Sequence, residues 1–174
     1  MLFADVRGST ALGEQMGPTA FATLLNRFYE IATNRVVAHR GLVDKLVGDE
    51  VMAFFFPGSS HEHTGRDAME TALGLMHDLG YGAGREPVLP VGIGVHVGPA
   101  WVGRIKTGSY TTVTALGDTV NTASRLQSEA AAGQIVVGEP LFADIPGSVH
   151  TVEEKALEIR GKEEIVPVRV ITLS

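Results

Sequence analysis

The chain has 174 residues, 44% of them hydrophobic and 20% charged, with a formal net charge of -6. This length and composition are typical of one globular domain that buries its own core. The acidic balance argues against nucleic acid as a partner, the absence of cysteine excludes disulfides and cysteine-ligated metal sites, and no apolar run reaches the roughly 20 residues needed to span a bilayer.

The first apolar residues, 2–4, have the character of the end of a buried strand, although the chain begins there. We therefore expect residues 1–174 to form a single domain that is a fragment of a longer protein. The rest of that protein could supply regulatory domains or a membrane anchor. The domain itself is expected in the cytoplasm, without membrane contact.

The apolar pattern predicts alternating strands and helices. Apolar residues at helical spacing indicate helices, and short apolar runs bounded by turn residues indicate strands. In chain order the expected elements are a strand at 1–5, a helix from 9 or 10 to 40 that restarts at 17–18, strands at 42–47 and 51–56, a helix at 66–79, strands at 91–97, 101–105 and 110–115, a helix at 119–132, a strand at 134–137 and three short strands within 149–173.

Such an order is typical of an α+β domain with a mainly antiparallel sheet and helices on one side. Ser9 or Thr10 is the expected N-cap of the first helix. The strands at 101–105 and 110–115 are expected to pair with the strand at 91–97. A turn at 48–50 would join two strands into a hairpin.

Two acidic residues lie where an acid is costly unless it is used. Asp5 ends an apolar strand, and Asp49 lies at the tip of the apolar hairpin. If these strands are neighbours, both carboxylates reach one end of the sheet, and paired carboxylates suit Mg²⁺ or Mn²⁺. Alternatively, Asp49 is a turn residue and Asp5 caps the following helix. Spacing alone does not decide between the two.

Three weaker signals have equally plain structural explanations. The glycine-containing turn at 6–10 feeds a helix N-terminus, where backbone N–H groups suit a phosphate. Asn121 and Arg125 lie four apart on a predicted helix, so they share one face that could hold a ribose and a phosphate, or could simply be solvated. Lys45 lies within an apolar strand and must face solvent, a partner or a ligand.

Other candidates are weaker still. The run His61-Glu62-His63 has no zinc-site spacing and is interpreted as a surface loop. His96 is interpreted as structural. The side chain of Trp101 is expected in the core or at an interface.

Four ordered segments are far more specific together than any one alone. They are Phe3 to Thr10, Lys45 to Phe54, Gly94 to Pro99 and Leu116 to Leu126, with Ile159 to Lys162 and Pro167-Val168 in the tail. In this order they resemble the catalytic domain of the class III adenylate and guanylate cyclases over nearly the whole chain. The resemblance implies a ferredoxin-like βαββαβ core and an adenylate cyclase that uses two divalent metal ions.

The resemblance also assigns roles to residues. The assigned residues are Asp5, Val6 and Asp49 for the two metal ions, Val6, Arg7, Gly8, Ser9 and Thr10 for the triphosphate, Lys45 and Thr114 for the base, Asn121 for the ribose and Arg125 for charge on the α-phosphate. Lysine can donate to adenine N1, and a threonine hydroxyl can accept from the adenine amino group, so ATP is favoured over GTP. Thr114 is similar to the threonine-containing branch, whose members often respond to bicarbonate.

The family works as a head-to-tail dimer, so the resemblance implies a homodimer with two shared sites. Two features depart from the family pattern. Val113 stands where many members have an aromatic residue, and the stretch around Arg104 and Lys106 does not align cleanly, which leaves these two only as candidate phosphate ligands.

Two rival interpretations remain open at the level of sequence. A diguanylate cyclase shares a hairpin like that at 47–51 but not the segment with Asn121 and Arg125. A non-catalytic nucleotide-binding or regulatory dimerisation module is the other alternative, although such modules usually lose one of the residue sets that this chain retains.

Overall fold

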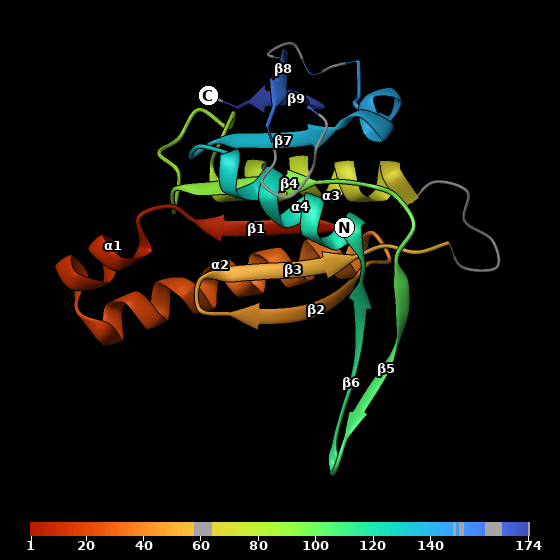
Figure 1. The fold of residues 1–174 in the computed structure, drawn as a ribbon. Coiled ribbons are helices and arrows are strands. Elements are labelled where there is room, and N and C mark those ends of the chain that lie inside the picture. Colours follow the sequence, from red (N-terminus) through yellow and green to blue (C-terminus); the bar gives the residue numbers. More distant parts are fainter. Residues whose placement is uncertain (58–63, 148, 150–151, 159–164, 174) are drawn as a thin grey trace.

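The computed structural model describes residues 1–57, 64–147, 149, 152–158 and 165–173. Within these residues, a seven-stranded sheet has the order β2-β3-β1-β4-β7-β9-β8 (Figure 1). Its strands are β1 (Leu2–Val6), β2 (Leu42–Val47), β3 (Glu50–Phe54), β4 (Val91–Val95), β7 (Gln134–Gly138), β8 (Val152–Leu157) and β9 (Val166–Thr172). Neighbouring strands are antiparallel except β4 and β7, which are parallel.

The first four strands confirm the predicted core. Their order β2-β3-β1-β4, with helices after β1 and β3, is the ferredoxin-like βαββαβ arrangement within a mixed α+β fold. The helices are α1 (Ser9–Met16), α2 (Pro18–Ala38), α3 (Thr64–Leu79) and α4 (Asp118–Glu129), followed by a 3₁₀ helix at Glu139–Asp144 that the sequence did not predict.

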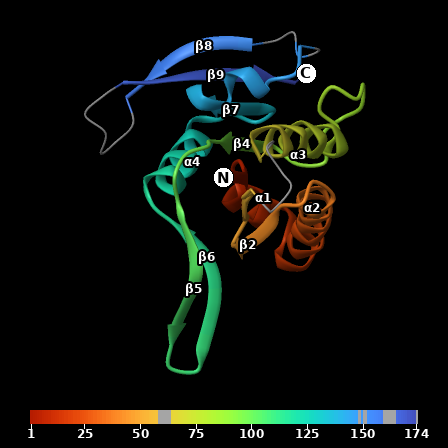
Figure 2. The same cartoon turned by 90° about the vertical axis from the view of Figure 1, so that its right-hand side faces the viewer.

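Helices cover both faces of the sheet, so the prediction of helices on one side is wrong. Figure 2 shows α2 and α3 on one face and α4 on the other. Successive residues of a strand point to opposite faces. Accordingly, Leu2 and Ala4 pack in the core with Phe28 of α2, whereas Phe3 packs with Ala123 of α4. The continuous apolar run of β1 reflects burial on both sides.

Glycines in β4 let α4 lie close to the sheet. A Cβ atom built on Gly94 would stand 2.2 Å from the backbone nitrogen of Gln127, and one on Gly92 would stand 2.6 Å from the Ala130 carbonyl oxygen. Any side chain at these two positions would push the helix outward. The glycine alternation in the sequence therefore fixes the height of α4 above β1 and β4.

Strands β5 (Trp101–Thr107) and β6 (Tyr110–Leu116) pair with each other in a separate two-stranded ribbon. The prediction that they pair with the strand at 91–97 is wrong, because β4 already has β1 and β7 as neighbours. The ribbon projects away from the body of the molecule (Figures 1 and 2).

Two smaller predictions concern the start of α1 and the tail. Gly8, rather than Ser9 or Thr10, is the N-cap of α1; its φ of 66° lies in the left-handed region that glycine adopts at little cost. In the tail, β8 and β9 are two of the three predicted strands, and part of the predicted range lies outside the described residues. No helix in the same residues has the length and apolar character needed to cross a membrane.

Candidate active site

Asp5 and Asp49 meet at one end of the central strands. In the register of β1 and β3, Asp5 lies opposite Glu50, the residue after Asp49. The backbone N–H of Val6 donates to the Asp49 carbonyl oxygen at 3.3 Å. The two strands are neighbours. This meets the condition stated from the sequence, so both acids lie at the same end of the sheet.

This end of the sheet crowds negative charge. Burial raises the pKa of Asp5, and the nearby Asp49 carboxylate raises it further, while Arg7 partly offsets both effects. Arg7 Nη1 lies 3.3 Å from Asp5 Oδ2. The pKa of Glu50 is also raised, by burial first and then by Asp5 and Asp49. Sequence reasoning missed Glu50, although a hairpin added to β1 brings the residue after the turn opposite Asp5.

The hairpin turn that carries Asp49 is tied to α2. The Tyr29 hydroxyl donates a hydrogen bond to the Gly48 carbonyl oxygen. The pKa of Tyr29 is raised by burial and by the neighbouring Asp49. Tyr29 is a second residue that the sequence did not reveal, because the contact joins residues 19 apart in different elements.

The segment at 6–10 offers fewer phosphate donors than the sequence suggests. The backbone N–H of Val6 is bonded to Asp49, and that of Arg7 donates to the Pro90 carbonyl oxygen at 2.6 Å. The amides of Gly8, Ser9 and Thr10 remain at the start of α1, where the first N–H groups of a helix have no intrahelical partner. The Arg7 side chain turns inward and donates to the Gln127 carbonyl oxygen at 2.5 Å.

A hollow of about 330 Å³ adjoins these amides. Its lining comes from α1, α2 and the β2–β3 turn, namely Ser9, Thr10, Gly13, Phe21, Leu25, Gly48 and Asp49. It combines two hydroxyls and a carboxylate with apolar walls. Space for a ligand therefore exists directly beside one member of the acid pair.

Lys45 and Thr114 meet, although 69 residues separate them in the chain. Lys45 Nζ donates to Thr114 Oγ1 at 3.1 Å, and the Thr114 hydroxyl donates to Asp44 Oδ2 at 2.7 Å. Lys45 lies four residues before Asp49, roughly 13 Å along the strand at about 3.3 Å per residue. Asp44, whose side chain is fully buried, is a third residue that sequence reasoning missed.

Asn121 and Arg125 lie on α4 as predicted. The helix buries Thr122, Ala123 and Leu126 against the sheet, while Asn121 is exposed and Arg125 is half-buried. Asn121 is therefore accessible to a ligand or a second subunit, and Arg125 is partly accessible.

The remaining candidates from the sequence lie apart from these groups. Arg104 and Lys106 are exposed on the projecting β5–β6 ribbon. Trp101 is 51% exposed, so it does not belong to the core. His96 packs against Gly138, where a Cβ atom would stand 2.2 Å from Nδ1. The run at 61–63 lies outside the described residues.

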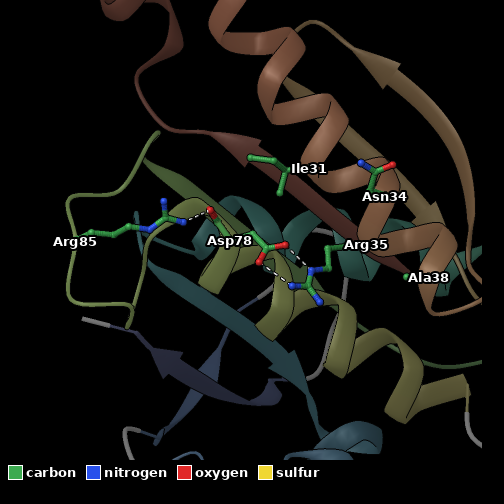
Figure 3. Close-up of a pocket in the computed structure, with 6 residues that line it drawn as sticks. All are labelled: Ile31, Asn34, Arg35, Ala38, Asp78 and Arg85. Carbon is green, nitrogen blue, oxygen red and sulfur yellow. Dashed lines mark hydrogen bonds and ion pairs between the residues drawn. The ribbon is translucent and has the colours of Figure 1, made fainter.

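A second hollow, of about 410 Å³, lies between α2 and α3. Arg35 donates to both carboxylate oxygens of Asp78 at 2.5 and 2.7 Å, and Arg85 donates to the Asp78 carbonyl oxygen at 2.6 Å (Figure 3). The charged groups of this hollow satisfy one another. It offers a ligand much less unpaired charge than the acid pair does.

The donor set at the acid pair fits a hard divalent cation. Among the described residues, no third acidic or histidine side chain joins a metal-binding cluster. Mg²⁺ is commonly held by one or two carboxylates together with substrate phosphates. Two acids therefore suffice, provided that the amides at the start of α1 hold the phosphates beside them. The pKa of Asp5 is raised by burial first and then by the Asp49 carboxylate, and a cation would offset both effects by stabilising the charged form.

Comparison with known proteins gives matches over nearly the whole chain. A family model described as the adenylate and guanylate cyclase catalytic domain matches residues 1–171. An adenylate cyclase of Anabaena cylindrica is 28% identical over an alignment of 177 residues that covers 97% of this chain and 35% of that protein. The chain thus spans little more than a third of that relative's length.

Solved structures agree with the fold. The adenylyl cyclase CyaB from P. aeruginosa superposes with a TM-score of 0.84 and 25% identity, covering 99% of this chain and 92% of that one. The guanylyl cyclase Cya2 superposes with a TM-score of 0.81 and 24% identity, covering 99% of this chain and 91% of that one. Structures of similar fold therefore include proteins named for either nucleotide.

Proposed function

The chain belongs to the family of adenylate and guanylate cyclase catalytic domains, and from this premise we propose that it converts ATP into 3′,5′-cyclic AMP and pyrophosphate. The ribose 3′ oxygen forms a bond to the α-phosphorus, the bond to the pyrophosphate oxygen breaks, and the hydroxyl proton is released. The observation that carries the choice of ATP is the 3.1 Å contact between Lys45 Nζ and Thr114 Oγ1. Together they offer a donor for adenine N1 and an acceptor for its amino group.

Asp5, Asp49 and the Val6 carbonyl would hold two divalent cations, Mg²⁺ or Mn²⁺. When bound, such ions lower the pKa of the ribose 3′-hydroxyl and offset charge on the departing pyrophosphate. The raised pKa of Asp5 supports this assignment, because burial and a neighbouring carboxylate disfavour its charged form until a cation arrives.

The chain's own donors would orient the substrate. The amides of Gly8, Ser9 and Thr10 lie at the positive end of α1 and are suited to phosphate oxygens. Asn121 would position the ribose, and Arg125 would offset charge that develops on the α-phosphate during the attack. We assign Arg7 to Asp5 rather than to the phosphates, because its guanidinium already forms that ion pair.

We further propose that the site is shared between two copies of the chain. Exposed apolar side chains occur on β2 and on the β5–β6 ribbon, namely Leu46, Val47, Trp101, Val113 and Leu116. Exposed apolar patches of this kind usually mark an interface. In a symmetric dimer, one chain would complete the site whose acids come from the other, and it would do so with Lys45, Thr114, Asn121 and Arg125.

The test is product formation by the purified protein with Mn²⁺ and either ATP or GTP. We expect cyclic AMP from ATP and much less cyclic GMP from GTP. Cyclic GMP as the main product would reject the assignment of the base, and no product from either nucleotide would favour the non-catalytic alternative.

A mixing experiment tests the shared site. Asp49→Ala and Arg125→Ala should each be inactive alone. When they are mixed in equal amounts, about a quarter of wild-type activity should return, since half of the randomly exchanged dimers are mixed and each contains one intact site. No recovery, with subunit exchange verified, would count against the shared site.

A further inference from the structure

Asp44 is a buried acid beside the proposed base site. Its side chain is fully buried, and its Oδ1 atom has no hydrogen-bond partner within the described residues. Its Oδ2 atom accepts from Thr114 and lies 3.4 Å from Lys45 Nζ, but the buried Oδ1 atom without a partner still costs stability. The arrangement points to a functional role.

A β-bulge aims this carboxylate. In the pairing of β2 with β3, Val43 lies opposite Ala53 and Lys45 lies opposite Met52, so Asp44 is the extra residue of β2. Neighbours in a regular strand point to opposite faces, but a bulge re-aims a side chain. Asp44 and Lys45 consequently both reach Thr114.

The hydrogen bonds leave the Thr114 oxygen without a proton to offer. A hydroxyl has one hydrogen and two lone pairs, while a carboxylate only accepts. The hydrogen of Thr114 is committed to Asp44 Oδ2 at 2.7 Å, and one lone pair accepts from Lys45 Nζ at 3.1 Å. Towards any further group, Thr114 can act only as an acceptor.

The entry of a base would need one movement. Thr114 is 1% exposed, while the Lys45 side chain is 46% exposed. If the ammonium turns outward to a ring nitrogen, it frees the lone pair that it now occupies. The same movement gives up the 3.4 Å contact between Lys45 Nζ and Asp44 Oδ2, but the hydrogen bond from Thr114 to Asp44 need not break.

We propose that Asp44 is a positioning residue that sets nucleotide specificity by holding the Thr114 proton, which makes Thr114 an obligate acceptor for the base. This rests on the proposed function of the same site. The adenine amino group satisfies such an acceptor, whereas guanine presents its O6 oxygen there, lone pair against lone pair. Rejection follows because buried polar groups would be left unpaired.

The test compares Asp44→Asn with the wild type. An amide can donate to Thr114 Oγ1, so the hydroxyl proton is released and can turn to guanine O6. We expect the ratio of kcat/KM for ATP to that for GTP to fall by about tenfold, the effect of one buried hydrogen-bond mismatch. An equal loss with both nucleotides at an unchanged ratio would mean that Asp44 only supports the strand, and would overturn the proposal.

Variants of Thr114 provide the controls. Thr114→Val removes the hydroxyl with little change in shape and should lower the ratio by itself; this keeps the proposal testable if Asp44→Asn does not fold. Adding Asp44→Asn to Thr114→Val should change the ratio no further, whereas Thr114→Ser should preserve it. A further drop in the double variant would overturn the proposal.

A binding measurement separates this proposal from the proposed activity. Displacement of a fluorescent N-methylanthraniloyl nucleotide by ATP and by GTP reports base preference without turnover. Selective displacement by ATP that is lost in Asp44→Asn supports the role of Asp44 even if no cyclic nucleotide forms. A wild-type protein that binds both nucleotides equally would overturn the role of Asp44, although turnover of ATP could still stand.

Discussion

Two groups of charged side chains in this molecule are built in opposite ways. Three acids, namely Asp5, Asp49 and Glu50, lie close together at the end of β1, and Arg7 is the cation beside them. The pKa values of Asp5 and Glu50 are raised. Between α2 and α3, Asp78 receives two hydrogen bonds from Arg35, and these bonds lower its pKa.

The contrast separates a candidate site from a structural ion pair. A charge with a matched partner favours the folded chain, whereas crowded like charges oppose it until a ligand neutralises them. Functional sites often retain such a cost in stability. The pocket in Figure 3 and the hollow beside Asp49 thus differ less in size than in whether their charges are already paired.

The largest difference between the two groups is expected from a matched pair of amide substitutions. Asp5→Asn should lower cyclic AMP formation by more than the roughly hundredfold that even outer-shell metal partners can contribute. In chelator, the same change should raise the free energy of unfolding by about 1 kcal/mol, because the surroundings disfavour the charge. Urea unfolding and product assays measure both effects.

Asp78→Asn is the control with the same chemical change. It should lower the free energy of unfolding slightly and leave turnover intact, because the Arg35 guanidinium loses its partner. If both variants lost stability to the same degree, the charge on Asp5 would not destabilise the folded chain, and the proposed difference between the two groups of charges would be rejected.

Asp5 and Asp78 should also affect the pH dependence of stability in opposite directions. The folded-state pKa of Asp5 is raised, so the wild type loses stability as pH rises from the ordinary value of 3.8 through the raised pKa. In the presence of a metal chelator, the free energy of unfolding of Asp5→Asn should rise above that of the wild type across that window, and the difference should then level off. The folded-state pKa of Asp78 is lowered, so its contribution is present above 3.8 and is lost as pH falls through the lowered pKa.

Unfolding measured for the wild type and both amide variants over about pH 3 to 7 tests these signs, since free carboxyl groups titrate near the lower end of that range. The two difference curves should have opposite signs at the upper end and converge towards zero at the lower end. Curves of the same sign would show that the directions of the two pKa shifts do not govern stability.

The sequence could place each acid at the end of an apolar strand and could predict the core, because both depend on local patterns; that the two acids meet depends on the pairing of β1 with β3. Asp5 follows an apolar strand and Asp49 follows another, and neighbouring strands bring such ends together. The ferredoxin-like order follows from the succession of elements. The uninterrupted apolar run at 1–4 also carried a signal for burial on both faces, which the prediction of helices on one side overlooked.

Other features could not be predicted from local patterns. Alternation along β2 places Asp44 and Lys45 on opposite faces, and only the bulge overrides it. The bond from Tyr29 to the Gly48 carbonyl depends on how α2 packs, which no local pattern specifies. Strands β5 and β6 pair only with each other, because both edges of β4 are already occupied by other strands.

A third prediction concerns the support of the acid pair. Tyr29→Phe removes the hydrogen bond to the Gly48 carbonyl oxygen and loosens the turn that carries Asp49. We expect turnover to fall by about tenfold, within the range known for outer-shell partners, and the free energy of unfolding to fall by about 1 kcal/mol. Because a displaced ligand weakens metal binding, kinetics at several Mn²⁺ concentrations should show a higher Mn²⁺ concentration at half-maximal activity.

Tyr81→Phe is the matched control for that change. The Tyr81 hydroxyl donates to the Leu89 carbonyl oxygen at 3.0 Å and accepts from the Val91 N–H at 3.2 Å, in the connection between α3 and β4. Its loss should cost stability without altering the metal dependence. Equal kinetic defects in the two phenylalanine variants would remove Tyr29 from any special role at the turn.

The smallest effect is expected at the ion pair between α2 and α3. The Arg35 and Asp78 side chains are each 34% exposed, so solvent screens them and the pair should contribute at most about 1 kcal/mol. Arg35→Gln and Asp78→Asn should each lower the free energy of unfolding by about 0.5 kcal/mol, and the double variant by little more than either, because both remove one interaction. Turnover should stay at the wild-type level in all three, since these charges satisfy each other and lie outside the acid pair. A tenfold loss of activity in any of them would show that the hollow between α2 and α3 is coupled to the acid pair, and that paired charges do not distinguish structure from function in this fold.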